Sequence, residues 1–242
     1  MGDGGLGSGA ALLDYYQSNK KIKDKSASEV DNVYLSKEFS EAEMEAAIKE
    51  EGLAYQRFDN VEEEVGKLLA DGKVIARFNG AMEYGPRALG NRSIIGAPFD
   101  KTINDWLNKK LNRTEFMPFA PSMIEEKAGT YLEGFKKEHI AADFMTITYT
   151  MKEGMKDVIP AVVHVDNTAR PQIVKKSTNP SYHAIIEAFG KHSGNPVVLN
   201  TSFNIHEEPI VYSPEDAIRG FLGAELDYLA MGPFLIPLPE GK

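Results

Sequence analysis

Two arginines in a glycine-rich segment are the residues of this chain best suited to binding an anion. Arg87 and Arg92 lie within FNGAMEYGPRALGNRS, residues 78–93, which has glycine at positions 80, 85 and 90. A guanidinium group stays charged and presents a planar fork that matches a phosphate or a carboxylate. Glycine has no Cβ, so backbone N–H groups can approach an oxyanion closely. The sequence therefore predicts an anion-binding loop.

Two later segments carry polar side chains that could share a site with this loop. RTEFMPFAPS, residues 113–122, begins with Arg113 and is held extended by its prolines, although taken alone it is better explained as an edge strand. HVDNTARPQ, residues 164–172, is dense in hydrogen-bonding side chains, which is typical of a binding site. His164 is equally consistent with a structural histidine, and Arg170 with a structural ion pair.

A further segment, LNTSFN at residues 199–204, follows an apolar run and contains Asn200, Thr201 and Ser202. Hydroxyl and amide groups at the end of a strand can hold phosphate oxygens. Ser202 could instead be a nucleophile, but no Gly-x-Ser-x-Gly turn surrounds it, which favours binding. The sequence HEE at 206–208 does not have ordinary metal-ligand spacing.

The composition limits the classes of partner. The 242 residues include 27 basic and 36 acidic residues, a net charge of −9, which disfavours nucleic acid and anionic membranes as partners. The chain has no cysteine, so disulfides and thiolate metal sites are excluded. It shows no secretory signal pattern and no run of 18 apolar residues. We expect a cytoplasmic protein without a membrane partner.

The chain divides into three parts by composition. Residues 1–17 form a glycine-rich turn that leads into an apolar helix, and residues 18–37, rich in Lys, Ser and Asp, are expected to be a linker. Residues 38–242 alternate between strand and helix patterns, which predicts an α/β or α+β domain. A capping box at Ser40 and Glu43 marks the first helix of that domain.

The expected elements of this domain follow from hydrophobic periodicity and from turn residues. Helices are expected at 41–51, 61–70, 101–111, 125–134, 182–192 and from 214. Strands are expected at 53–58, 74–78, 93–97, 116–121, 144–151, 159–165, 172–174, 197–203, 228–231 and 234–236.

Four motifs resemble, in order, the C-terminal domain of the carbamoyltransferases related to nodulation and antibiotic O-carbamoyltransferases. They read EYGPRALGNRSI, MPFAP, HVDNTARPQ and LNTSFNIHEEPIV, and the resemblance covers roughly residues 74–236. It implies a YrdC-like domain, an open twisted mixed sheet with flanking helices. In this family the domain follows an actin/hexokinase-like domain that performs the final transfer.

The resemblance implies that the domain uses carbamoyl phosphate and ATP, with Mg²⁺, to form carbamoyl-adenylate. The partner domain then passes the carbamoyl group to a hydroxyl acceptor. By motif match, the expected catalytic residues are Arg87, Arg170 and Ser202. The residues expected to bind carbamoyl phosphate or ATP are Arg92, Arg113, His164, Thr168, Asn200 and Thr201. Arg92 and His164 are second choices, and for Arg92 the alternative is that it only braces the loop.

The first residues also match this family. GDGGLGSGAAL is similar to the end of the actin-like domain, where an aspartate helps to hold iron or another divalent metal. Asp3 matches that aspartate, and the histidine ligands of the family lie far upstream, so Asp3 is expected to be an orphan ligand. The resemblance implies that residues 1–17 are a remnant of that domain and that the N-terminal domain is the partner.

Three positions depart from the family pattern. Asn112 stands near a usual lysine, Met117 replaces an arginine, and Asn167 replaces a glycine. Two alternative functions therefore stay open. Other YrdC-like proteins act in transfer-RNA modification, which suggests a nucleic-acid-binding module, although the net charge of −9 counts against it. The other alternative is a non-catalytic interaction domain.

Overall fold

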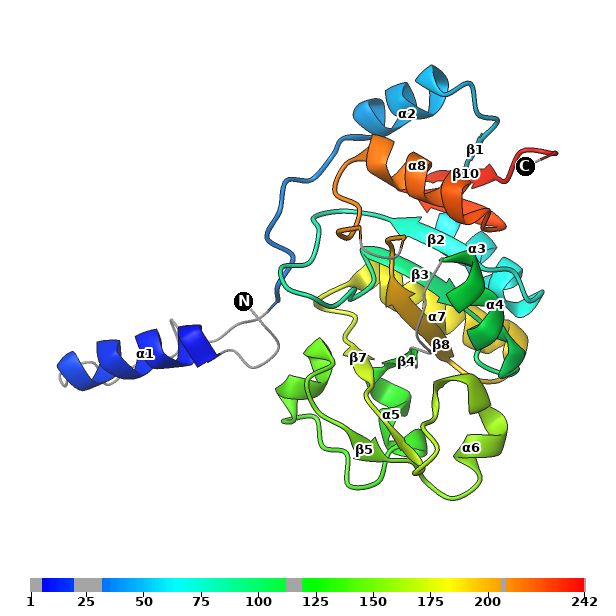
Figure 1. The fold of residues 1–242 in the computed structure, drawn as a ribbon. Coiled ribbons are helices and arrows are strands. Elements are labelled where there is room, and N and C mark those ends of the chain that lie inside the picture. Colours follow the sequence, from blue (N-terminus) through cyan, green and yellow to red (C-terminus); the bar gives the residue numbers. More distant parts are fainter. Residues whose placement is uncertain (1–5, 20–31, 112–118, 206–207, 242) are drawn as a thin grey trace.

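The computed structural model describes residues 6–19, 32–111, 119–205 and 208–241. Helix α1 (Leu6–Ser18) lies apart from the remaining elements, and none of its residues is buried (Figure 1). Asp3 lies outside the described residues. None of the helices in the described ranges is both long and apolar enough to span a lipid bilayer.

An open mixed sheet of eight strands forms the centre of the fold. Its spatial order is β1 (Gln56–Arg57), β10 (Phe234–Pro237), β9 (Tyr228–Met231), β2 (Ile75–Phe78), β3 (Arg92–Gly96), β8 (Val197–Ser202), β4 (Ala120–Ile124) and β7 (Gln172–Val174). The pairs β2–β9 and β4–β7 are parallel, and the other pairs are antiparallel. This architecture, with helices on both faces, confirms the expected fold class.

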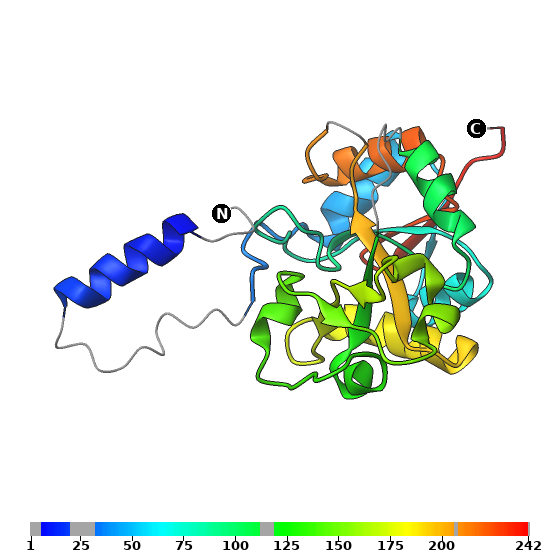
Figure 2. The ribbon, with the colours of Figure 1, turned by 60° about the horizontal axis from the view of Figure 1, so that its bottom comes forward.

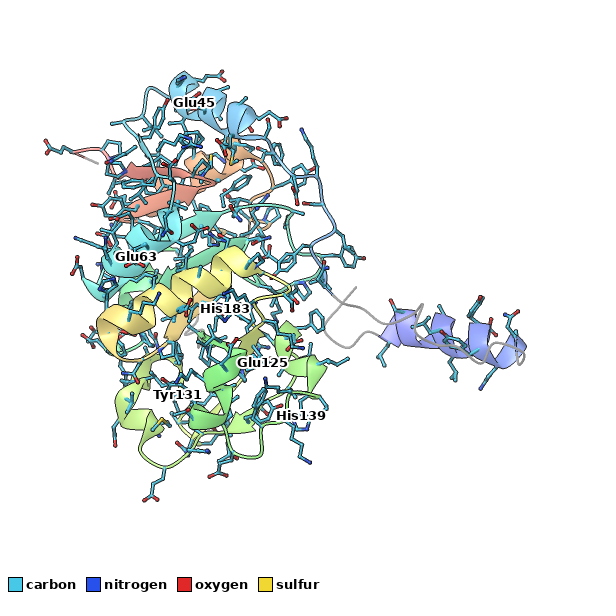
Figure 3. All side chains as sticks on the ribbon, turned by 180° about the vertical axis from the view of Figure 1, so that it is seen from behind. Glu45, Glu63, Glu125, Tyr131, His139 and His183 are labelled. Atoms are coloured by element: carbon cyan, nitrogen blue, oxygen red, sulfur yellow. The ribbon has the colours of Figure 1, made fainter. Side chains whose placement is uncertain are left out.

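The two faces of the sheet carry separate hydrophobic clusters because successive side chains of a strand point in opposite directions. On one face, Ile75 and Ile95 pack with α3 (Val61–Ala70) and α7 (Pro180–Ser193). Figure 3 shows these two helices side by side from behind, with Glu63 on α3 and His183 on α7. Gly66 of α3 permits their close approach, since a Cβ there would lie 2.5 Å from Ala188 Cβ.

The opposite face is covered by three other helices. These are α2 (Glu41–Glu50), α4 (Thr102–Lys110) and α8 (Pro214–Ala224), which pack on the strand residues Ala76 and Ile94. Capping boxes begin α2 and α8, at Ser40 with Glu43 and at Ser213 with Asp216. The expected capping box at Ser40 is thereby confirmed.

A long crossover joins the parallel strands β4 and β7. It contains α5 (Glu125–Tyr131), a 3-10 turn (Ile140–Phe144), β5 (Tyr149–Thr150), α6 (Met155–Val158), a second 3-10 turn (Pro160–Val162) and β6 (Thr168–Ala169). β5 and β6 pair in a small antiparallel sheet beside the main one. Figure 2 shows this small sheet at the front.

Four expected strands differ from the structure. The strand expected at 116–121 begins outside the described residues, and within them β4 runs from Ala120 to Ile124. The strand expected at 53–58 is reduced to Gln56–Arg57. The strand expected at 144–151 is reduced to Tyr149–Thr150, because Phe144 ends a 3-10 turn and Met145 has a left-handed φ of 55°. The strand expected at 159–165 is wrong, because Pro160 begins a 3-10 turn instead.

Position 90 requires glycine for two reasons: its backbone conformation and the lack of room for a Cβ atom. Its φ is 112°, and an added Cβ would lie 2.3 Å from Tyr182 Cδ1. We predict that Gly90→Ala lowers the free energy of unfolding by about 2 kcal/mol or more. Gly129→Ala is the control, because nothing lies within 4 Å of its added Cβ, and it should leave stability unchanged or slightly raised. Urea unfolding measures both; equal stability of the two variants would contradict the prediction.

The capping box of α2 predicts an acid-dependent contribution to stability. Hydrogen bonds from Lys37 and from Ser40 lower the pKa of Glu43 from 4.5 to about 2. A carboxylate with a lowered folded pKa stabilises the fold above its unfolded pKa and loses that effect as pH falls. The stability difference between the wild type and Glu43→Gln should therefore be constant above about pH 5 and shrink as pH falls from 4.5 towards 2. Thermal unfolding across this range tests it, and a difference that does not change with pH would argue against the assignment.

Candidate functional site

A cavity lies where β8 ends beside the beginning of β4, and all four polar segments contribute to its wall. The space between these segments, part of which is open to solvent, has a volume of about 450 Å³. It is lined by Pro86, Arg87, Ala88, Phe119, Ala120, Met145, Arg170, Asn200, Thr201 and Ser202. The structure thus brings together five of the predicted site residues: Arg87, Arg170, Asn200, Thr201 and Ser202. Segments more than 100 residues apart in the chain meet at one place.

The loop between β2 and β3, residues 79–91, is called the arginine loop below. A buried carboxylate folds it: Glu83 Oε1 accepts backbone N–H bonds from Leu89 at 2.7 Å, Asn91 at 2.6 Å and Arg92 at 3.2 Å. Glu83 is only 4% exposed. Sequence reasoning missed Glu83, although an acidic residue between glycines and beside two arginines was a signal for it.

A short segment before the first helix of the domain, residues 32–36, crosses this loop and is called the strap. Tyr34 forms an antiparallel bridge with Glu83, and its hydroxyl donates to Leu89 O at 2.8 Å. Ser36 Oγ accepts from Met82 N at 2.6 Å. Burial raises the pKa of the Tyr34 phenol well above its usual range, so the hydroxyl remains a donor. The strap holds the loop from its outer side.

The two arginines of the original motif have different surroundings. Arg87 is half-buried at the cavity, whereas the side chain of Arg92 is fully buried. Arg92 pairs with Phe78 across β2 and β3, so the two side chains share the sheet face opposite to that of Ser93 and Ser202.

The guanidinium of Arg92 binds the protein's own backbone. Nη1 donates to Asn79 O and Asn91 O, each at 2.9 Å, and Nη2 donates to Gly80 O at 3.2 Å. It also lies 3.6 Å from the centroid of the Phe78 ring. Burial lowers the pKa of Arg92 to about 10. This geometry is that of a brace for the base of the arginine loop, which is the alternative to a substrate contact.

His164 and Thr168 shape the loop that precedes Arg170. His164 Nδ1 lies 3.0 Å from Thr168 Oγ1, and Thr168 donates from both its Oγ1 and its backbone N to Asp166 Oδ1. His164 also lines a second cavity, which shares Phe119 with the first. The structure therefore places His164 beside the candidate site, and the local bonds of Thr168 are those of a turn.

Asn167 adopts a left-handed φ of 62°, and its Nδ2 donates to Met151 O at 2.9 Å. Asparagine tolerates this conformation better than other residues with a Cβ. The replacement of the family's glycine by Asn167 is thus compatible with the same turn. The positions of Arg113, Asn112 and Met117 lie outside the described residues.

The hydroxyl of Ser202 donates to Asn204 Oδ1 at 2.6 Å. An amide oxygen can orient a hydroxyl but is not a base that could activate it for attack. Among the described residues, no group of three or more His, Cys, Asp or Glu side chains has the arrangement of a metal site. These observations favour the binding role for Ser202.

Comparison with known proteins adds to this geometry. Residues 66–237 match the family model described as "Carbamoyltransferase C-terminus". The chain belongs to this family. The resemblance of the four motifs is thereby confirmed, and the candidate site lies within the matched part of this carbamoyltransferase domain.

Several relatives of this carbamoyltransferase domain are longer proteins. It is 40% identical to protein MJ1051 of Methanocaldococcus jannaschii, over 98% of this chain and 45% of the relative. It is 37% identical to nodulation protein NolNO of Sinorhizobium fredii, over 97% of this chain and 34% of the relative. A 3'-hydroxymethylcephem-O-carbamoyltransferase of Amycolatopsis lactamdurans is 33% identical, over 64% of this chain and 29% of the relative. The chain thus spans less than half the length of these relatives.

Among solved structures, full-length HypF in its phosphate- and nucleotide-bound form superposes with a TM-score of 0.50 and 18% sequence identity. The match covers 74% of this chain and 22% of HypF. At this identity the likeness concerns the fold alone.

The bracing role of Arg92 leads to a prediction about stability. Arg92→Lys should lower the free energy of unfolding by about 2 kcal/mol, because one ammonium group cannot reach the carbonyls that the guanidinium bridges. Arg219→Lys is the control, since the Arg219 side chain is 65% exposed and its change should stay within about 0.5 kcal/mol. Guanidinium unfolding measures both. An Arg92→Lys variant of wild-type stability that had lost phosphate binding would instead identify Arg92 as a ligand.

Proposed function

We propose that this chain is the adenylate-forming part of an O-carbamoyltransferase. It uses carbamoyl phosphate and ATP to make carbamoyl-adenylate, which a partner domain transfers to a hydroxyl acceptor. The observation that carries this proposal is the convergence of Arg87, Arg170, Asn200, Thr201 and Ser202 on one cavity in a chain of the carbamoyltransferase family. Two guanidinium groups, two hydroxyls and an amide suit a substrate that bears both a phosphate and a carbamoyl group.

The proposed reaction proceeds in two balanced steps. The phosphoryl group of carbamoyl phosphate passes to water, which releases inorganic phosphate and a proton and leaves carbamate in the site. A carbamate oxygen then attacks the α-phosphorus of ATP, the bond to the β-phosphate breaks, and pyrophosphate leaves. Phosphoryl transfer of this kind depends mainly on positioning and on neutralising charge. Arg87 and Arg170 supply that charge, and Thr201 and Ser202 position phosphate oxygens.

Mg²⁺ fits this site as a companion of the nucleotide. Among the described residues, those that line the cavity offer hydroxyl and amide oxygens but no carboxylate. Mg²⁺ is often held by few protein ligands together with substrate phosphates and water. We propose that it arrives with ATP and that phosphate oxygens supply most of its ligands, where it offsets the charge of the leaving pyrophosphate.

The final transfer is proposed to need a second domain. The relatives MJ1051 and NolNO are more than twice as long as the part that this chain matches. The proposed partner is the actin-like domain that precedes this one in the family. It would take up carbamoyl-adenylate and release AMP on transfer of the carbamoyl group to the hydroxyl acceptor.

Arg170→Ala tests the site assignment. Removal of a charge-assisted hydrogen bond to phosphate should weaken carbamoyl phosphate binding by about tenfold to a hundredfold. Arg219→Ala is the matched control, because Arg219 lies on α8 in an exposed ion pair with Asp216. Calorimetric titration of freshly dissolved carbamoyl phosphate, with and without Mg·ATP, gives the affinities. Unchanged binding by Arg170→Ala would show that the phosphate lies elsewhere.

A further inference from the structure

Two buried side-chain amides beneath the arginine loop are each held in one orientation. Gln172 Nε2 donates to Leu89 O at 2.7 Å. A backbone carbonyl can only accept, so this bond fixes which end of the Gln172 amide carries nitrogen. Gln172 Oε1 therefore faces Ser122, whose Oγ donates to it at 2.7 Å.

The orientation of Gln172 fixes that of Asn200. Asn200 Nδ2 lies 3.0 Å from Gln172 Oε1 and 3.1 Å from Ala88 O, both of which only accept. A flipped Asn200 amide would place Oδ1 against these two acceptors, so Nδ2 must face them. The cross-strand register agrees, because Ser122 pairs with Gln172 and Ala120 pairs with Asn200, which puts all four residues on one face of the sheet.

The remaining oxygen of this amide receives no hydrogen bond within the part of the chain that the structure describes. Asn200 is 2% exposed, and its Oδ1 is buried without a hydrogen bond from any residue in the described ranges. Asn200 also lines the cavity of the candidate site. A buried acceptor without a donor is costly, so a ligand that brings an N–H group to it gains affinity, and a ligand of the same shape without one does not.

We propose that Asn200 Oδ1 accepts a hydrogen bond from the amino group of the carbamoyl substrate, and so selects carbamoyl phosphate over acyl phosphates of the same shape. Gln172 and Ser122 are positioning residues that keep the oxygen of Asn200 towards the ligand. This inference rests on the proposed function, because it assumes that the cavity binds a carbamoyl phosphate.

Two stable phosphonates test the selection with the full chain. Phosphonoacetamide carries the amide, whereas 2-oxopropylphosphonate has a methyl group in place of its NH₂ and is otherwise the same. Titration calorimetry in the presence of Mg²⁺ and α,β-methylene-ATP should show that the amide binds at least about tenfold more tightly than the ketone.

Variants separate the role of the oxygen from the shape of the site. Asn200→Leu should bring the affinity ratio of amide to ketone close to one, while ketone binding stays within about twofold of wild type. Gln172→Met should lower the same ratio with ketone binding retained, because it frees the Asn200 amide to turn. Asn104→Leu is the control: Asn104 is a buried asparagine on α4 that donates to Ala161 O at 2.9 Å, and its variant should keep the wild-type ratio.

The outcomes distinguish this inference from the proposed function. Equal affinity of the wild type for amide and ketone overturns the selection by Asn200 and leaves the proposed function intact. An Asn200→Leu variant that keeps the wild-type ratio of amide to ketone affinity would likewise overturn the selection by Asn200 and leave the proposed function intact. Binding of neither phosphonate overturns the proposed function together with the inference. If far-ultraviolet circular dichroism shows a variant to be unfolded, the wild-type ratio alone decides.

Discussion

The Glu83 carboxylate is the group on which the geometry of the candidate site depends. One of its oxygens accepts three backbone N–H bonds from the far side of the arginine loop, and so joins the start of that loop to the beginning of β3. Buried N–H groups must be paired, and a single side-chain oxygen satisfies three of them here without a regular element. The carbonyls of Ala88 and Leu89 lie on the turn that these bonds create, and they orient the amides of Asn200 and Gln172. The orientation of these two amides therefore depends on the Glu83 carboxylate.

The register of the sheet places Arg92 and the two cavity residues Asn200 and Ser202 on opposite faces, whereas Thr201 shares the face of Arg92. Side chains of neighbouring residues on β3 and β8 point to opposite faces, so Arg92 bonds to carbonyls on one side while Ser202 and Asn200 lie on the other. The same strands thus anchor the arginine loop and contribute to the wall of the cavity. Arg87 lies in the loop rather than on a strand, so the strand register does not fix its direction, and it lines the cavity.

The sheet and most helices could be predicted from the sequence, because apolar periodicity and capping residues report on burial. The capping box at Ser40 and the helix expected from 214 both correspond to observed helix starts. The crossover between β4 and β7 could not be predicted in the same way, because its short apolar runs around Pro160 pack as turns rather than as strands. At the site, residue types identified the segments that converge. They left open whether Arg92 binds a ligand or braces the loop, because that depends on the strand register. They did not reveal the role of Glu83, because its partners are backbone groups.

The strap has a consequence for how this polypeptide can be divided. A boundary drawn at residue 38, where composition changes from linker to domain, would leave the sheet and both helical layers whole. It would also discard Tyr34 and Ser36, and with them the bonds to Leu89 O and Met82 N. A fragment trimmed in this way would retain its core and lose the outer support of its anion loop. A fragment made for expression or fusion should therefore begin before the strap, so that these bonds are kept.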